Sequence, residues 1–404
     1  LVLRYPQDHE TGVQRAGAAL APTRSFILVV NQIGNGLSTS PHNTPFPEGG
    51  PAFPQVRIGD DVRAQYRLAT ERFGLEKLAL VVGGSMGAQP TYEWCVRYPD
   101  FVARAAPIAG TARNSEHDFL FTRTLVEAIT SDPAFAGGHY RESTEVHAGL
   151  HRHARLWGVM GLSTEFYQKK VWRAAGFSSV EDFLRRFLEP SFLGMDPNHL
   201  LCMAWKWQRG DIARHSHGKL AAALGRIRAR TRVIAIDEDM FFPPRDCRAK
   251  QGLIPGSDDR EVATPAGHLG LFGTDPGSIG QVDASLRELL GGTRFAGAGR
   301  ESGSPREPGL PRVHRERTLA AGERRPATRA LPAPLFRAAL LFLPHAADDR
   351  PVDGVVEEAG VGAGSDPVEV GDVLPEAVDA GEGHQAGGIE PPGVALLDPL
   401  DPPA

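Results

Sequence analysis

Three residues far apart in this sequence of 404 residues could together make a serine nucleophile. Ser85, Asp239 and His268 provide a hydroxyl, a carboxylate and an imidazole. A serine hydroxyl becomes a strong nucleophile when a histidine accepts its proton, and that histidine needs a carboxylate to orient and stabilise it. Each of the three comes just after a predicted strand. We therefore expect a catalytic triad, with Asp237 as the alternative carboxylate.

The turn around Ser85 has the pattern of a nucleophile on a sharp corner. The apolar run LALVV at 78–82 is typical of a central parallel strand. Glycines at 83, 84 and 87 permit a tight strand-to-helix turn, which leaves the serine hydroxyl exposed at its apex. The backbone N–H of Met86 is expected to stabilise the oxyanion, with Gln7 as the second donor. A glycine-serine loop without a chemical role is the alternative for this motif alone.

Strand and helix patterns alternate on both sides of this turn. Strands are predicted at 1–5, 26–30, 78–82, 103–109, 232–236 and 261–264, and helices at 60–73, 86–97 and 282–290. The alternation predicts a parallel sheet with right-handed crossovers and helices on both faces. Pro90 lies within the helix at 86–97 and has no N–H for the carbonyl of residue 86. Either the first turn is irregular or this helix begins later.

The acids at 237–239 follow the predicted strand 232–236, and ligands bind at the carboxyl ends of strands in open α/β sheets. Asp239 is preferred because it lies further into the loop than Asp237 does. A second loop, NQIGNGLSTSP at 31–41, lacks the Gly-Lys-Ser/Thr ending of a phosphate-binding loop. We expect this loop at the rim of the active site, with Asn35 and Gly36 as candidate substrate contacts.

The strand pattern stops between about residues 111 and 230, where helical patterns dominate. An insertion of this length between two strands predicts a helical cap over the active site. Some of its tryptophans are expected to line an apolar pocket, Trp205 among the candidate substrate contacts, and at least half to form the core of the cap. The four are Trp157, Trp172, Trp205 and Trp207.

Composition excludes several classes of function. The formal net charge of −5 and the absence of a long basic run argue against nucleic acid binding. Three scattered cysteines fit buried thiols in a reducing compartment, and His147, His151 and His153 cannot share one helical face, so no metal site is predicted. No signal peptide and no apolar run of 18 residues is visible, which predicts a soluble, cytoplasmic protein without a membrane partner. The first residue, Leu1, suggests that an N-terminal portion is missing.

The C-terminal part is a different kind of polypeptide. Residues 301–404 contain 13 glycines and 15 prolines, and such a chain buries too little apolar surface to offset its conformational entropy. We therefore predict a core at 1–110 and 231–292, a helical cap at 111–230 and a disordered tail at 293–404. Translation of a shifted reading frame is the alternative origin of the tail.

Several motifs resemble the homoserine O-acetyltransferase family of α/β-hydrolases, in which serine, acid and histidine occur in this order. They are GGSMGAQPTYEW at 83–94, YPD at 98–100, NQIGNGLSTSP at 31–41, DEDMFFPP at 237–244 and GH at 267–268. The resemblance covers roughly residues 1–290. It implies an α/β-hydrolase fold and acyl transfer from acetyl-CoA or another acyl-CoA, through an acyl-serine, to a small alcohol. Ser85 would be the nucleophile, Asp239 would orient, and His268 would act as base and then acid, with no bound cofactor.

Two positions depart from that family. Leu269 follows His268 where the resemblance implies an aspartate that binds the substrate ammonium, and Gly194 stands where an arginine is usual. Both changes argue against homoserine as the acceptor. The alternatives are an esterase of small acyl esters with the same triad, and a truncated relic without catalysis. We also expect that two copies can associate as a homodimer.

Overall fold

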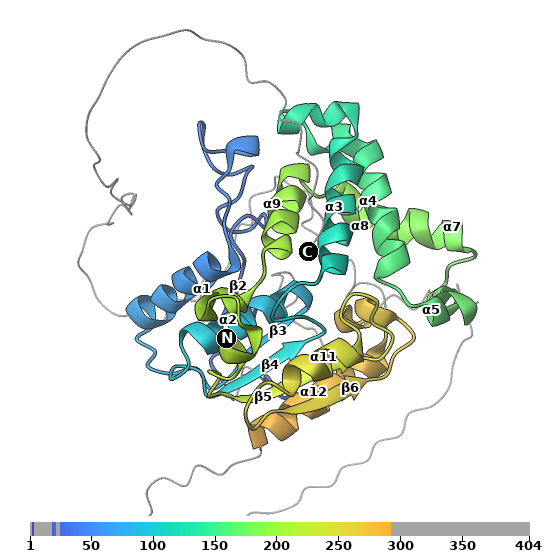
Figure 1. The fold of residues 1–404 in the computed structure, drawn as a ribbon. Helices are drawn as coiled ribbons and strands as arrows, with labels where there is room; N and C mark the ends of the chain where they lie inside the picture. The colour runs from blue at the N-terminus through green and yellow to red at the C-terminus, as the bar shows by residue number, and fades with distance from the viewer. Residues whose placement is uncertain (1, 4–17, 22–24, 292–404) are drawn as a thin grey trace, which may run out of the picture. The chain divides into compact units, whose positions relative to one another are not determined.

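The computed structural model describes residues 2–3, 18–21 and 25–291 (Figure 1). The predicted oxyanion donor Gln7 and the predicted tail at 293–404 lie outside these ranges. Six strands form one sheet in the order β2-β1-β3-β4-β5-β6, and every neighbouring pair is parallel, as predicted. The strands are β1 Val2–Leu3, β2 Val29–Val30, β3 Val81–Gly84, β4 Arg104–Ile108, β5 Arg230–Ile236 and β6 Asp258–Val262.

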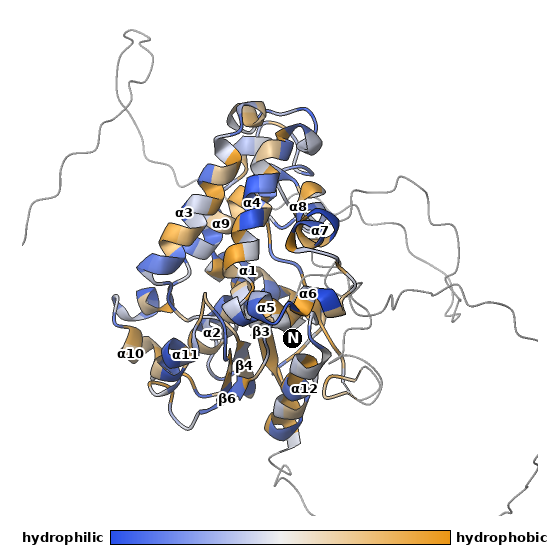
Figure 2. Cartoon of the chain, turned by 90° about the vertical axis from the view of Figure 1, so that its right-hand side faces the viewer, coloured by the Kyte–Doolittle hydropathy of each residue, from blue (hydrophilic) through white to orange (hydrophobic). Residues whose placement is uncertain are grey.

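Helices cover both faces of this sheet because successive strand residues point to opposite sides. On one face Val81, Ala105 and Val233 pack with α1 (Ile58–Arg67), α2 (Ala88–Arg97) and α11 (Pro244–Gln251). On the other face Val82, Ala106 and Ile234 pack with α12 (Pro276–Gly291). Most of α11 is coloured hydrophilic in Figure 2, which agrees with its sequence PRDCRAKQ. The predicted arrangement of a parallel sheet between helices is confirmed.

Every element between β4 and β5 is helical, and this segment lies within the predicted cap. Its longest helices, α3, α4 and α9, lie side by side with α8 (Figure 1). The α-helices of the segment are α3 Glu116–Thr130, α4 His147–Met160, α5 Thr164–Gln168, α6 Val171–Ala174, α7 Val180–Phe183, α8 Glu189–Leu193, α9 Pro197–Gln208 and α10 Leu220–Leu224. Within the segment the shorter helical pieces are η4 Pro133–Gly138, η5 Ser143–Val146, η6 Leu184–Leu188 and η7 Ile212–Ser216. Outside it they are η1 Gly50–Ala52, η2 Leu68–Arg72, η3 Ser85–Gly87 and η8 Gly267–Phe272.

Several predicted elements have other bounds in the structure. The helix expected at 60–73 begins at Ile58 and continues as η2, the last strand lies at 258–262 and not at 261–264, and the last helix begins six residues before residue 282. The strand expected at 26–30 is reduced to β2 at an edge of the described sheet, where Phe26 is 67% exposed. The helix expected from residue 86 begins at Ala88, after the single 3-10 turn η3. Pro90 is therefore the third residue of α2, where a backbone N–H has no helical acceptor. The irregular first turn and the later start both occur, and the proline disrupts no helical hydrogen bond.

A buried ion pair holds α9 against α1 and the loop that precedes it. Lys206 Nζ lies 2.6 Å from Asp61 Oδ2, and the two side chains are 0% and 1% exposed. Lys206 Nζ also donates to the Ile33 carbonyl at 2.7 Å, and the Ile33 N–H donates to Asp61 Oδ1 at 2.8 Å. Both charges are therefore paired and hydrogen-bonded, which is the condition for burying them.

Removal of one partner of this pair should destabilise the protein strongly. We expect Lys206→Met to lower the free energy of unfolding by about 3–5 kcal/mol, because the Asp61 charge is left buried without a partner. Chemical denaturation of the full chain measures this loss. The exposed Lys77→Met is the matched control and should change stability by less than about 0.5 kcal/mol. If Asp61→Asn/Lys206→Met were less stable than Lys206→Met alone, the uncompensated charge would not be the cause.

Candidate active site

The structure brings Ser85, Asp239 and His268 together in one chain of hydrogen bonds. Ser85 Oγ lies 2.8 Å from His268 Nε2, and His268 Nδ1 lies 2.7 Å from Asp239 Oδ2. The three residues follow β3, β5 and β6, whose carboxyl ends meet at one edge of the parallel sheet. The carboxylate is hydrogen-bonded to the imidazole, and the imidazole to the hydroxyl. His268 can therefore accept the serine proton during a nucleophilic attack.

Close backbone packing holds Ser85 at the apex of its turn. Ser85 has a left-handed backbone with φ of 54°, a conformation that non-glycine residues rarely adopt and that marks strained functional turns. A Cβ atom on Gly83 would lie 2.2 Å from the Gly87 carbonyl oxygen, so the strand can approach the following turn only when residue 83 is glycine. The glycines of the motif thus allow the corner that presents the hydroxyl.

Asp239 is oriented by main-chain donors, and Asp237 is turned elsewhere. The Phe241 and Phe242 N–H groups donate to Asp239 Oδ1 at 2.8 and 3.0 Å, which leaves Oδ2 for His268. Asp237 Oδ1 instead accepts from the N–H groups of Glu238 and Thr264. The structure therefore places Asp239 beside the imidazole and gives Asp237 a role in holding the loop between strands.

Aromatic rings surround the imidazole of His268. The ring centroids of Phe241, Phe242 and Phe272 lie 4.9, 5.7 and 5.9 Å from that of His268. The His268 side chain is 0% exposed, and so is that of Asp239. Water is thus kept from the hydrogen bond between them, and in such an environment that bond is stronger than it would be in solvent.

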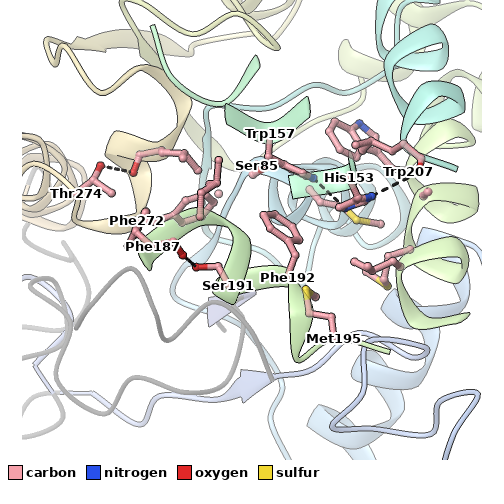
Figure 3. Close-up of a pocket in the computed structure, with 18 residues that line it drawn as sticks. Ser85, His153, Trp157, Phe187, Ser191, Phe192, Met195, Trp207, Phe272 and Thr274 are labelled. Carbon is pink, nitrogen blue, oxygen red and sulfur yellow. Dashed lines mark hydrogen bonds between the residues drawn. The ribbon is translucent and has the colours of Figure 1, made fainter. Parts of the chain in front are cut away.

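A cavity of about 160 Å³ lies beside Ser85, between the sheet edge and the helical segment (Figure 3). None of the described residues that line it is Asp, Glu, Lys or Arg. Its two other hydroxyls are occupied: Ser191 donates to the Phe187 carbonyl and Thr274 to the Leu269 carbonyl. The lining residues are Gly84, Ser85, Met86, Leu125, His153, Trp157, Phe187, Leu188, Ser191, Phe192, Met195, Leu200, Met203, Ala204, Trp207, Leu269, Phe272 and Thr274.

The other predicted site residues divide into two groups. Met86 and Leu269 line the cavity. Asn35, Gly36 and Trp205 do not, so the structure does not support their prediction as contacts to a substrate at Ser85. The loop at 31–41 packs on a different face of α9, and Trp205 lines a separate pocket, because the side chains of that helix point in several directions. The roles of Met86 and Gln7 as oxyanion donors stay predictions.

Sequence reasoning missed much of the cavity wall. One side of the cavity is formed by residues of η6 and α8 and by Met195, which follows them. The apolar periodicity of residues 183–195 could have indicated this wall, but the segment is interpreted from the sequence only as part of the cap. Trp157 and Trp207 line the cavity, whereas Trp172 packs in a separate apolar cluster. Two of the four cap tryptophans thus line the cavity. The sequence periodicity alone could not predict which of the four would do so.

His153 is a buried histidine in the cavity wall, and it is uncharged at neutral pH. Burial lowers the pKa of its imidazole to about 4, because a charged ring would lose its hydration. Among the described residues no group of three His, Cys, Asp or Glu side chains could hold a metal ion. Within the same ranges, no helix has both the length and the apolar content to cross a bilayer.

The two neighbouring carboxylates offer a matched test of the hydrogen-bond chain. An alkyl fluorophosphonate phosphonylates an activated serine, so intact mass measures how fast Ser85 reacts. We expect Asp239→Asn to slow this reaction about 10,000-fold, because the amide favours the wrong imidazole tautomer. Asp237→Asn should slow it less than about tenfold, because Asp237 does not touch the imidazole. Equal effects of the two substitutions would contradict the assignment of Asp239.

The depressed pKa of His153 should appear in the pH dependence of stability. Between pH 6.5 and about 4 the unfolded chain protonates this histidine and the folded chain does not, so folding stability falls as pH falls. From pH 7 to pH 4, wild type should lose about 3 kcal/mol more than His153→Gln. Denaturant unfolding of both proteins at each pH measures the difference. Parallel losses would show that His153 is not buried in the neutral form.

Comparison with known proteins places this geometry in a family. Residues 12–274 match the family model of the alpha/beta hydrolase fold. Ethyl acetate hydrolase from Pseudomonas veronii is 61% identical over 274 residues, which cover 68% of this chain and 78% of that protein. A solved structure of an acetylester hydrolase from Corynebacterium glutamicum is 55% identical with a TM-score of 0.68, and the match covers 69% of this chain and 80% of that one.

The resemblance to homoserine O-acetyltransferases is also confirmed, at lower identity. The enzyme from Rhodopseudomonas palustris is 32% identical over 306 residues, which cover 70% of this chain and 76% of that protein. The two ester hydrolases are thus far more similar to this chain than that transferase is. The relatives on both sides of this comparison, ester hydrolases and acyltransferases, are enzymes, and their similarity extends over most of the described chain. This protein is therefore an enzyme of the same fold. The protein belongs to the α/β-hydrolase fold family.

Proposed function

We propose that this protein is an esterase that hydrolyses short, neutral acyl esters through an acyl-serine at Ser85. The observation that carries the proposal is the cavity beside Ser85, whose described lining has no charged side chain. Its volume of about 160 Å³ suits one small organic molecule, since an apolar cavity of ~150 Å³ binds benzene. The two ester hydrolases at 61% and 55% identity support the same conclusion.

The lack of charged side chains in the described cavity lining argues against homoserine as the acyl acceptor and acyl-CoA as the donor. Homoserine carries an ammonium and a carboxylate, and acyl-CoA carries phosphates. An unpaired charge costs several kcal/mol when it enters an apolar site. Leu269 offers an alkyl group where the ammonium would need a carboxylate, and neutral His153 offers no counter-charge. A neutral ester meets no such penalty, so hydrolysis of neutral esters is preferred over the acyl-CoA reaction.

Ser85, His268 and Asp239 would each have a separate role in the hydrolysis. His268 Nε2 accepts the proton of Ser85 as Oγ attacks the ester carbonyl, and Asp239 stabilises the imidazolium. The same proton passes to the departing alkoxide, so an alcohol leaves and an acyl-serine remains. His268 then takes a proton from a water, which attacks the acyl carbon. The imidazolium returns this proton to Ser85 Oγ as the ester bond breaks, so the carboxylic acid leaves and the serine is free again. The Met86 N–H is the proposed first donor to the oxyanion.

Acyl transfer is the second candidate function, because an alcohol can replace water in the last step. The homoserine O-acetyltransferase relatives favour it, and the triad serves either acceptor. A relic without catalysis is opposed by the hydrogen-bonded triad, whose distances of 2.7 and 2.8 Å suit proton transfer. The same triad can therefore serve hydrolysis or transfer, and the acceptor that reaches the acyl-serine decides between them.

Donors that share the acetyl group and differ in charge test the proposal. We expect kcat/KM for ethyl acetate to exceed that for acetyl-CoA by more than about 100-fold, because the cavity lining offers no partner for a charged donor. Release of acetate measures the first reaction and release of free thiol measures the second. Ser85→Ala is the control and should abolish both.

Two outcomes would overturn the proposal. If acetyl-CoA were the better donor and homoserine accepted the acetyl group, the protein would be a transferase despite its uncharged cavity. If neither donor reacted with wild type, the relic hypothesis would replace it. Acetate release that is independent of added alcohols would support hydrolysis over transfer.

A further inference from the structure

One polar side chain in the cavity wall makes contacts that the triad does not use. His153, in α4, accepts a hydrogen bond at Nε2 from Trp157 Nε1 at 3.1 Å. Its Nδ1 lies 3.5 Å from the Leu125 carbonyl oxygen of α3. An indole N–H can only donate, so Nε2 must be unprotonated and the ring proton must be on Nδ1, facing Leu125. One neutral tautomer satisfies both contacts, which Figure 3 draws as dashed lines.

Trp157 connects this histidine to the catalytic centre. Its ring centroid lies 5.5 Å from that of Phe241, and Phe241 lies 4.9 Å from His268 in an edge-to-face arrangement. Trp157 also stacks on Phe192 at 5.9 Å, on the side of the cavity formed by α8. The indole is therefore part of the wall that a bound acyl or alcohol chain would touch, and Phe241 connects it to the imidazole of His268.

We propose that His153 is a positioning residue that sets the chain-length preference of the esterase by fixing the indole of Trp157 in the cavity wall. This inference rests on the proposed function, since it concerns the same cavity. Trp157 is held by one directional bond in addition to its packing, and the bond comes from the side chain one helical turn away. The cavity therefore keeps a defined size beside Ser85.

Comparison with a second indole supports a specific role for this bond. Trp207 also lines the cavity, yet its Nε1 has no hydrogen-bond partner in the described part of the chain. Of the two indoles that line the cavity, one therefore has an N–H without a partner among the described residues, and one has a bonded N–H. The N–H of Trp157, in contrast, donates to His153. That histidine is only 3% exposed, and in its neutral form Nε2 can accept the bond.

Substitution of the acceptor in the full-length chain tests the inference. We measure kcat/KM for p-nitrophenyl acetate and butyrate and compare the butyrate-to-acetate ratio. His153→Leu should raise this ratio about tenfold, because a freed indole can move and enlarge the cavity by the space of two methylenes. His153→Gln, whose amide oxygen can accept the indole N–H, should keep the ratio within about twofold of wild type. His147→Leu, at the exposed first residue of α4, is the matched control and should not change it.

A double substitution separates the hydrogen bond from general damage to the cap. In Trp157→Phe the indole N–H is gone, so adding His153→Leu should leave the ratio unchanged. If His153→Leu shifts the ratio as much in that background as in wild type, or not at all in wild type, the assignment is wrong. A wild type that cleaves neither ester would remove the proposed function as well, whereas an active wild type with an unaltered ratio would overturn this inference alone.

A second readout does not depend on activity. The sequence has five tryptophans, so the indole N–H of Trp157 can be assigned in an NMR spectrum by its loss in Trp157→Phe. Its hydrogen exchange should be slow in wild type and in His153→Gln, and about tenfold faster in His153→Leu. Equal exchange in wild type and His153→Leu would show that the bond does not hold the indole.

Discussion

The short hydrogen bond between His268 and Asp239 is the interaction on which the proposed chemistry depends. It requires that the ends of β5 and β6 lie side by side, and the serine after β3 must reach the same edge. Two main-chain N–H groups, from Phe241 and Phe242, hold the carboxylate, and three aromatic rings exclude water from the imidazole. The sheet is thus the frame that turns three distant residues into one reactive group.

The helical segment supplies the second constraint, which is a cavity wall beside Ser85 without charged side chains among the described residues. Its helices bring alkyl and aromatic side chains over Ser85, and the one titratable residue among them, His153, is neutral because it is buried. The buried pair of Asp61 and Lys206 fixes α9 from its other face, so charge is used for attachment and excluded from the cavity. The proposed preference for neutral esters rests on this separation.

The proximity of Ser85, Asp239 and His268 could be predicted from the sequence because each follows a predicted strand, and parallel strands end at one edge of a sheet. The signals at β3 and β5 are strongly apolar, whereas β6 has the sequence DDREV and gave a weaker one. The cap residues that line the cavity could not be predicted in this way. Trp205 and Trp207 are two residues apart on one helix, and only tertiary packing decides which of them faces the cavity. The loop containing Asn35 and Gly36 has the composition of an active-site loop but packs against α9. The expected acyl-CoA donor came from resemblance, and the uncharged lining argues against it.

The most direct test of the central claim is the mass of the protein during turnover of p-nitrophenyl acetate. If Ser85 is the nucleophile, rapid acid quenching will trap wild type with one added acetyl group, and peptide mapping will place that group on Ser85. His268→Ala should not accumulate it at the same rate. An acetyl group on another residue, or turnover without any adduct in wild type and unimpaired in Ser85→Ala, would contradict the account.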